Sequence, residues 1–125
     1  MYNGSSYGVD IESIARVDRA LERSGDGFLN RIFTAAERAR GKDTAFLATR
    51  FAAKEAFFKA LGTGLTGGVR WHDFDLPFKE DRPPDPSVSG KSLELLAGRK
   101  VLVSVSHTSR MAAAVVFLEG SGGLP

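Results

Sequence analysis

Asp10 is a carboxylate set among apolar residues, with Tyr7, Val9 and Ile11 around it. Burying an ionised carboxylate is costly unless a cation or a metal accompanies it, so this position could do chemistry. The simpler interpretation is that the side chain faces solvent or caps the helix that follows. Glu12 lies two residues later and points to the same side if the strand continues through it. The two acids are therefore candidates for holding a cation.

Glu55 and Lys59 form a second candidate group in the middle of the chain. They are four residues apart, which places them on one helix face with the small residues Ala48 and Ala52. A Glu–Lys pair at this spacing is usually a surface ion pair worth a few tenths of a kcal/mol, but small neighbours indicate that another element packs there. If Glu55 converges with Asp10, two carboxylates make an oxygen site that suits Mg²⁺, which also accepts phosphate oxygens from a substrate.

Two further features could contact phosphate. His107 follows a predicted strand in the segment Val-Ser-His-Thr, where it is either an ordinary turn residue or a phosphate contact. Gly62 and Gly64 lie in a loop that matches neither the P-loop nor the dinucleotide fingerprint. This loop either simply ends a helix or offers backbone amides to a phosphate.

Arg16, Arg19 and Arg23 form a basic stripe along one face of a predicted helix. Such a stripe is most often a solvated surface. With Arg31 nearby in the sequence, it is also a candidate docking surface for an acidic protein partner.

Periodicity predicts the elements that must position these groups. Apolar spacing indicates a helix that starts near Glu12, and capping-box spacing indicates a short helix that starts at Thr34. A long helix from Asp43 or Thr44 to Leu61 should have Gly62 just beyond its end. In chain order we expect a strand over 7–11, helices over 12–24 (ended by 25–27), 34–41 and 44–61, a strand over 69–76, a loop or edge over 77–90, a helix or strand over 92–97, and a hairpin of strands 101–106 and 111–118.

Composition excludes several classes of protein. A chain of 125 residues fits one domain, with an ordered core over about residues 7–119. The absence of Cys excludes disulfides, thiolate zinc sites and Cys nucleophiles, and two His make an all-His metal cage improbable. A net charge of +2 is too small to indicate a nucleic-acid binder, and no apolar run is long enough to span a membrane. We therefore expect a cytoplasmic protein with neither a nucleic-acid nor a membrane partner.

Taken together, four segments resemble holo-acyl-carrier-protein synthases, the short class of 4′-phosphopantetheinyl transferases, in order and in spacing. The resemblance covers about residues 7–119, and the central Arg-Phe-Ala-Ala-Lys-Glu-Ala block is its most specific part. The matching segments are 8–12, 31–37, 50–64 and 103–108.

This resemblance implies an α+β fold, with a small antiparallel sheet packed on the long helix, and a homotrimer with sites at its subunit interfaces. It also implies transfer of the 4′-phosphopantetheine group from coenzyme A to a serine of an apo acyl carrier protein, with release of adenosine 3′,5′-bisphosphate. The implied roles are catalysis by Glu55 and Lys59, binding of Mg²⁺ by Asp10 and Glu55, binding of coenzyme A by Arg50, Lys59, Gly62, Gly64 and His107, and docking of the carrier protein by Arg16 and Arg31.

Three features depart from the family pattern. Glu12 stands where double-length relatives supply a third metal ligand and short-class members often have no acid. It therefore either completes the metal site or begins the following helix. The linker over residues 37–50 is shorter than usual, and residues 82–86 replace the family's Gly-Lys-Pro turn.

Two other functions stay open from the residues alone. A metal-dependent nucleotide phosphohydrolase would use the same two acids and would turn over coenzyme A without a carrier protein. A non-catalytic carrier-binding module would keep the arginines but has no use for a metal site. Also open are the proton acceptor, which is either Glu55 or a metal-bound water, and the pathway of the carrier, which is fatty-acid, polyketide or peptide synthesis.

Overall fold

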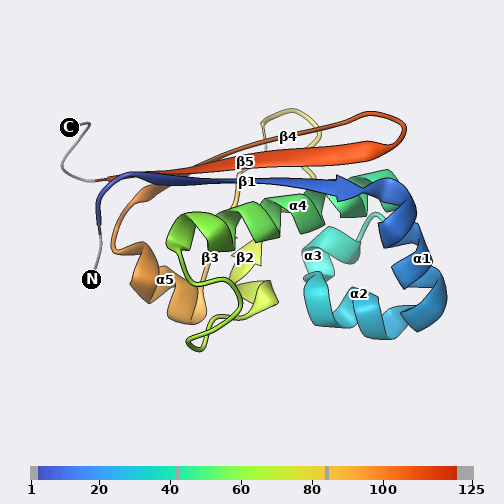
Figure 1. Cartoon of the computed structure of the whole chain (residues 1–125), viewed down its shortest axis with the longest axis horizontal. Coiled ribbons are helices and arrows are strands. Elements are labelled where there is room, and N and C mark those ends of the chain that lie inside the picture. The colour runs from blue at the N-terminus through green and yellow to red at the C-terminus, as the bar shows by residue number, and fades with distance from the viewer. Residues whose placement is uncertain (1–2, 42, 84, 121–125) are drawn as a thin grey trace.

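The computed structural model describes residues 3–41, 43–83 and 85–120, and a long helix packed across a three-stranded antiparallel sheet dominates it (Figure 1). These elements are the helix α4 (Thr44–Leu61) and the strands β1 (Ser6–Ser13), β4 (Lys100–His107) and β5 (Met111–Glu119). The strand order is β1-β5-β4, so β5 pairs with both other strands. The architecture confirms the expected α+β class and the predicted hairpin. Residues 1–2 and 121–125, predicted to lie beyond the ordered core, are outside the described residues.

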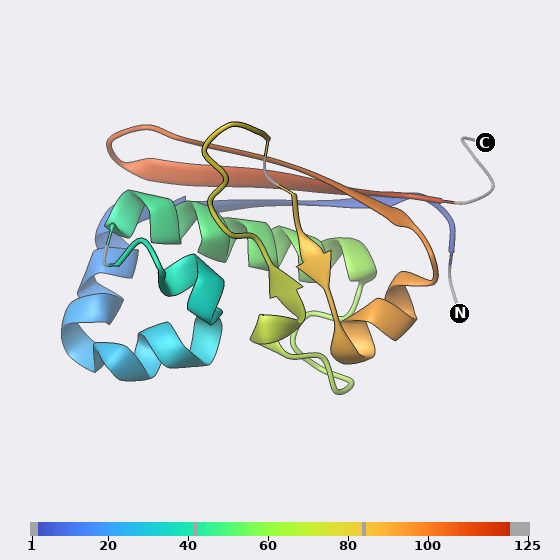
Figure 2. The same ribbon diagram turned by 180° about the vertical axis from the view of Figure 1, so that it is seen from behind.

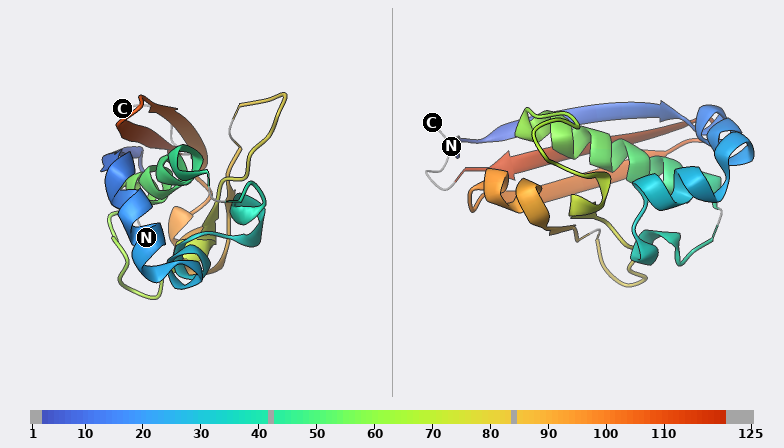
Figure 3. Two further views of the ribbon diagram at one scale, coloured as in Figure 1. Left: turned by 90° about the vertical axis from the view of Figure 1, so that its right-hand side faces the viewer. Right: turned by 90° about the horizontal axis from the view of Figure 1, so that it is seen from below.

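Shorter elements gather around α4 on the side away from the sheet, as the view from behind shows (Figure 2). Figure 3 shows α4 end-on, between the sheet and this second group. In the ranges that the structure describes, no helix is long and apolar enough to cross a membrane. The shorter elements are α1 (Ile14–Ser24), α2 (Asp26–Ile32), α3 (Ala35–Arg38), the 3₁₀ turn η1 (Trp71–Asp73), β2 (Phe74–Asp75), β3 (Ser87–Val88) and α5 (Gly90–Leu96).

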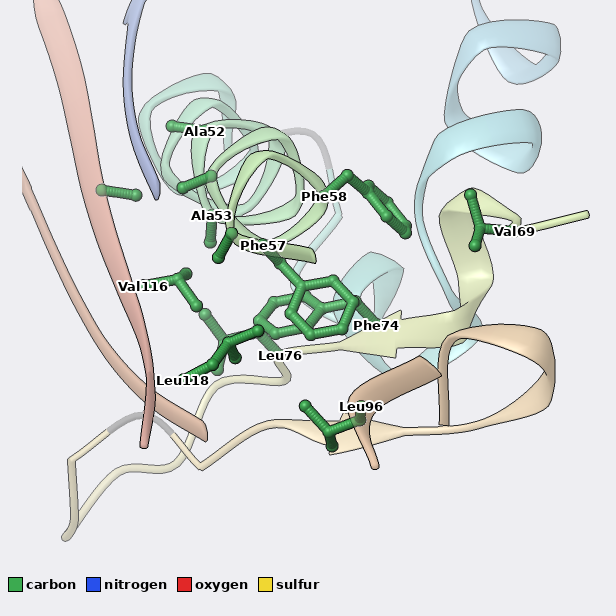
Figure 4. Close-up of a cluster of buried hydrophobic side chains, with 13 residues drawn as sticks. Ala52, Ala53, Phe57, Phe58, Val69, Phe74, Leu76, Leu96, Val116 and Leu118 are labelled. Carbon is green, nitrogen blue, oxygen red and sulfur yellow. The ribbon is translucent and has the colours of Figure 1, made fainter. Parts of the chain in front are cut away.

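The ends of α4 follow from its sequence. The Asp43 side chain accepts a hydrogen bond from the backbone N–H of Phe46 at 3.2 Å, and Gly62 ends the helix in the left-handed conformation with φ 82°. Both limits were predicted. Apolar residues surround the helix because it lies between two layers. Figure 4 shows part of the resulting core, which includes Ala52, Ala53, Phe57, Phe58, Phe74, Leu76, Val116 and Leu118.

Strand β1 lies unusually close to α4, and Gly8 makes this possible. A Cβ atom added at Gly8 would lie 2.0 Å from the backbone oxygen of Ala56. Because side chains alternate along a strand, Asp10 and Glu12 point to the same helix-facing side as Gly8. The residues between them, Tyr7, Val9 and Ile11, are exposed on the other face of the sheet.

We expect replacement of Gly8 by Ala to lower the free energy of unfolding by about 3 kcal/mol, because β1 must move off the α4 backbone to make room for the added methyl group. Urea unfolding monitored by circular dichroism measures this change. Gly27→Ala is the matched control, since nothing lies within 4 Å of a Cβ built at Gly27. That control should leave stability unchanged or raise it, because Ala is the better helix former. Equal effects of the two substitutions would contradict the close approach of β1.

The boundary around Gly25 differs from the prediction in one respect. Gly25 ends α1 as expected, with its N–H bonded to the carbonyl of Leu21 at 2.7 Å, but the unpredicted helix α2 follows directly. Helix α2 buries three apolar side chains, Phe28, Leu29 and Ile32, against the core. The next helix, α3, begins after Thr34 with the predicted capping box but ends at Arg38 rather than near Gly41.

Residues 69–76 do not form the predicted strand, because a buried carboxylate holds this segment in a turn. The Asp73 side chain accepts hydrogen bonds from the backbone N–H of Arg70 at 3.1 Å and from the hydroxyl of Ser92 at 2.7 Å. Only Phe74–Asp75 is a strand, β2, and it pairs with β3 inside the predicted loop or edge. The undecided stretch near Ser92 belongs to a helix, α5.

Candidate active site

Asp10 and Lys59 meet where β1 runs alongside α4 (Figure 1). The Lys59 ammonium donates a hydrogen bond to Asp10 Oδ1 at 2.8 Å and a second one to the backbone oxygen of Val9 at 3.1 Å. Asp10 is 8% exposed, whereas about half of the Lys59 side chain is exposed. The second carboxylate oxygen, Asp10 Oδ2, is buried and accepts no hydrogen bond. Lys59 therefore pairs with Asp10 rather than with Glu55, and the second oxygen of Asp10 has no cationic partner among the described residues.

The charge of Asp10 affects the pKa values of both Glu12 and Glu55. Burial, followed by the neighbouring Asp10 side chain, raises the pKa of Glu12 from 4.5 to about 8. Burial and then the negative charge of Asp10 also raise the pKa of Glu55, while the positive charge of Lys59 opposes this. Glu12 is the penultimate residue of β1 and does not begin the helix, which starts at Ile14. The charge of Asp10 thus reaches both acids and disfavours their ionisation.

The donor set of these acids fits a small divalent cation. A cation would supply the missing partner of Asp10 Oδ2 and would relieve the repulsion among the three acids. Within the described ranges no three acidic or histidine side chains are already gathered as a metal cage. Mg²⁺ needs no such cage, because one or two carboxylates suffice when water and substrate phosphates complete its shell.

Ionisation of Glu12 should make the stability of the metal-free protein depend on pH. With its pKa raised from 4.5 to about 8, the folded chain binds more protons than the unfolded chain between these values. The free energy of unfolding therefore falls as pH rises through this window. Urea unfolding in EDTA at about pH 5 and about pH 8.5 should show a larger decrease for the wild type than for Glu12→Gln, which cannot ionise. An equal decrease in both proteins would contradict the raised pKa.

Arg50 and His107 line one cleft of about 330 Å³. Arg50 is buried, and its Nε donates a hydrogen bond to the backbone oxygen of Leu76 at 2.8 Å. Burial lowers the pKa of Arg50 to about 10, so the guanidinium still carries its charge at neutral pH. His107 is exposed at the end of β4. The structure therefore brings together two residues that lie far apart in the sequence.

The same cleft contains residues that the sequence analysis did not single out. The Arg40 guanidinium lies 4.2 Å from the ring centroid of Phe78, and Arg50 lies 4.1 Å from that of Phe46. Arg40 also forms an ion pair with Asp43 at 3.6 Å. The spacing of Phe46 and Arg50, four residues apart on one helix, is a signal that could have indicated their contact.

The glycine loop after α4 ends the helix. The backbone N–H groups of Gly62, Thr63 and Gly64 all point to the carbonyl of Phe58, at 3.0, 3.2 and 3.4 Å. Gly62 and Gly64 adopt positive φ angles of 82° and 57°. The idea that these amides are free to bind a phosphate is therefore wrong for this conformation, and the simpler interpretation of the loop holds.

Arg16 and Arg31, the predicted docking residues, are both exposed but belong to different cavities. Arg16, on α1, lines a small cavity with Glu12, and its positive charge lowers the pKa of that residue. Arg19 and Arg23 lie beside Arg16 along α1 and share a second cavity with it. Arg31, on α2, lines a larger cleft together with Trp71 and His72. The acids at β1 therefore lie next to the first turn of a basic helix.

Comparison with known proteins agrees with this geometry. Residues 6–116 match the sequence model of the 4′-phosphopantetheinyl transferase superfamily. A holo-[acyl-carrier-protein] synthase of Koribacter versatilis is 42% identical over 90% of this chain and 95% of that protein, and one of Vibrio cholerae is 43% identical over 90% and 94%. The crystal structure of Helicobacter pylori holo-[acyl-carrier-protein] synthase in complex with coenzyme A is similar with a TM-score of 0.82 and 30% identity, covering 90% of this chain and 99% of that one.

Proposed function

The chain belongs to the 4′-phosphopantetheinyl transferase superfamily as a holo-[acyl-carrier-protein] synthase, and we propose that Asp10, Glu55 and Lys59 carry its chemistry. The enzyme transfers the 4′-phosphopantetheine group from coenzyme A to a serine of an apo acyl carrier protein. The serine oxygen bonds to the phosphorus that bears pantetheine, and the bond from this phosphorus to the bridging oxygen breaks. The serine proton passes to a base, and adenosine 3′,5′-bisphosphate leaves.

The buried Asp10 carboxylate, with one oxygen on Lys59 and the other unpartnered, is the observation that carries the assignment. Asp10 and Glu55 would hold Mg²⁺, and Glu12 near the end of β1 would complete the site. When bound, Mg²⁺ would neutralise the charge that develops on the pyrophosphate oxygens.

Lys59 is suited to the pyrophosphate because it is both charged and accessible. Its hydrogen bond to Asp10 raises its pKa, so the ammonium keeps its proton at neutral pH. About half of its side chain is exposed, and two of its three N–H donors are used by Val9 and Asp10, which leaves one donor to contact a phosphate oxygen. The Asp10 contact would thus hold Lys59 next to the metal site, where it could stabilise the charge of the leaving group.

The cleft of Arg50 and His107 is the proposed site for the adenosine end of coenzyme A. The Leu76 carbonyl holds Arg50 in place, so its guanidinium is oriented before the ligand arrives. The half-exposed ring of Phe78 lines the same cleft and offers a surface on which an adenine can stack, whereas the Phe46 ring is buried beneath Arg50. Gly62 and Gly64 would shape the loop near Lys59, since their amides are already bonded to Phe58.

The exposed face of the sheet supports assembly of the protein as a homotrimer. Large apolar side chains on this face are 41–69% exposed, and a patch of this kind marks an interaction surface. A closed ring of head-to-tail copies would cover it and would let a neighbouring subunit complete each site. Multi-angle light scattering should therefore give three times the mass of one chain. The apolar residues of this face are Tyr7, Val9, Ile11, Leu102, Met111 and Val115.

The carrier protein would dock on α1 and α2. Arg16 lies beside Glu12 at the acid cluster, and Arg31 extends the basic surface away from it. Electrostatic attraction between arginines and an acidic partner mainly raises the association rate and is weakened by salt.

Intact-mass spectrometry tests the function directly. A purified apo acyl carrier protein incubated with coenzyme A, Mg²⁺ and this enzyme should gain the mass of phosphopantetheine, and excess EDTA should prevent the gain. Release of adenosine 3′,5′-bisphosphate in the absence of carrier would instead indicate a nucleotide phosphohydrolase. Carrier binding without any mass gain would indicate a non-catalytic binding module.

A further inference from the structure

A cleft of about 340 Å³ lies between α2 and η1, apart from the residues proposed to bind the metal and coenzyme A. Arg31 of α2 lines one side, and Arg70, Trp71 and His72 line the other. The walls thus present two guanidinium groups and an imidazole, all of which donate hydrogen bonds to anions, beside an indole ring. We call this site the α2–η1 cleft.

The chain does not neutralise the charges of the α2–η1 cleft. Arg31, Arg70 and His72 are all exposed. Throughout the part of the chain that the structure describes, no carboxylate forms an ion pair with any of these three residues. The lysines of α4, in contrast, are both paired with acids. Unpaired guanidinium groups on a concave surface favour an anionic partner.

Aromatic contacts connect the α2–η1 cleft to the acid cluster. The Trp71 ring stacks on Phe51 with centroids 5.5 Å apart, and Phe51 lies 6.2 Å from Phe28. Phe28 and Phe51 line the small cavity that also contains Glu12 and Arg16. A protein substrate that reaches the acid cluster by spreading over this small cavity would therefore also come near the α2–η1 cleft.

We propose that the α2–η1 cleft binds an acidic segment of the acyl carrier protein, distinct from the segment that carries the serine. Arg70 and His72 are then docking residues in addition to Arg31. The inference rests on the proposed function, because the carrier protein is its macromolecular substrate. Coenzyme A is the less suitable occupant, since the α2–η1 cleft shares no residue with the cleft of Arg50 and His107.

Trp71 provides a direct test, because it is the only Trp of the chain and it lines the α2–η1 cleft. Titration with a Trp-free apo carrier protein should produce a saturable change of Trp71 fluorescence. The Kd fitted to this change should equal the Kd that fluorescence anisotropy of a labelled carrier gives independently. Arg70→Glu should weaken carrier binding and raise the KM for carrier about tenfold at low salt, and by less at high salt. The KM for coenzyme A should not change.

Arg82→Glu is the matched control, because it makes the same charge change at an exposed residue that lines none of the clefts described above. Its carrier affinity should stay near that of the wild type. Carrier binding by Arg70→Glu within about twofold of this control would overturn the proposal. Two results together would also overturn the proposal. One is a change of Trp71 fluorescence on adding coenzyme A alone, and the other is a raised KM for coenzyme A in Arg70→Glu. The binding measurements need no turnover. A wild-type protein that binds the carrier as predicted but transfers no phosphopantetheine would therefore contradict the proposed function and leave the docking proposal intact.

Discussion

Replacing Asp10 by Asn should lower the kcat/KM for phosphopantetheine transfer by roughly 10²–10³-fold, while the chain stays folded. Asn keeps an oxygen that can accept the hydrogen bond from Lys59, so the contact between β1 and α4 survives. The position of Asp10 Oδ2, which is buried and unpartnered, would instead carry a neutral amide group that cannot ligate a cation. A time course of carrier mass at several Mg²⁺ concentrations measures the loss.

The stability of the same variant separates a lost ligand from a damaged fold. Asp10 contributes to the raised pKa values of both Glu12 and Glu55, so removing its charge relieves repulsion in the metal-free protein. The melting temperature in EDTA should therefore not fall, whereas the stabilisation that Mg²⁺ gives the wild type should disappear.

Asp81→Asn is the matched control, since it removes the same charge at an exposed loop position. It should leave both the transfer rate and the response to Mg²⁺ unchanged. If Asp10→Asn kept more than about a tenth of the wild-type activity with the same Mg²⁺ requirement, another group would have to hold the cation.

Local patterns were sufficient where a short segment determines its own structure. Alternation along β1 correctly placed Asp10 and Glu12 on one side, because successive side chains of a strand point to opposite faces. The limits of α4 followed from a capping Asp43 and a terminal Gly62, both of which act within one helical turn. The long helix and the strand that carry the site were thus predictable.

Contacts between distant segments explain the errors. The segment before β2 has strand-like composition, but the hydrogen bonds of Asp73, including one from Ser92 nineteen residues away, hold it in a turn. Gly25 was correctly interpreted as a helix end, yet the burial of Phe28 and Ile32 stabilises a new helix immediately after it. Glu55 and Lys59 have the spacing of an ion pair, but the partner of Lys59 comes from β1.

The most consequential missed contact is a buried ion pair between Lys54 and Glu37. Lys54 lies off the helix face of Glu55 and Lys59, and its position in the sequence indicated no partner for it. Its ammonium is 2.9 Å from Glu37 Oε1, and both side chains are fully buried. It also donates hydrogen bonds to the backbone oxygens of Trp71 and Phe74. Helix α4 is thereby joined to α3 and to the segment that precedes β2.

This ion pair also supports the proposed coenzyme cleft. The second oxygen of Glu37 accepts a hydrogen bond from the backbone N–H of Leu76 at 2.8 Å. The carbonyl of Leu76 in turn accepts the hydrogen bond from Arg50 Nε. Lys54 and Arg50, one helical turn apart, are therefore the two ends of one hydrogen-bonded network. The network runs from Lys54 through Glu37 and Leu76 to the Arg50 guanidinium.

Replacing Lys54 by Met should lower the free energy of unfolding by about 3–5 kcal/mol, because it leaves the Glu37 carboxylate buried without its counter-charge. Urea unfolding at neutral pH measures this loss. Burial lowers the pKa of Lys54 and the Glu37 charge opposes that effect, so the pair is costly to break from either side. Removing both charges in Glu37→Gln/Lys54→Met should therefore cost less than Lys54→Met alone.

Lys91→Met is the control, because Lys91 is exposed on α5 and, among the described residues, forms no ion pair. Its effect on unfolding should stay within about 0.5 kcal/mol. Lys54→Met should also raise the KM for coenzyme A, since Leu76 loses the network that positions Arg50. A Lys54→Met protein that unfolds within about 1 kcal/mol of the wild type would show that the buried pair contributes no more than a surface one. The double variant Glu37→Gln/Lys54→Met would then be no more stable than Lys54→Met.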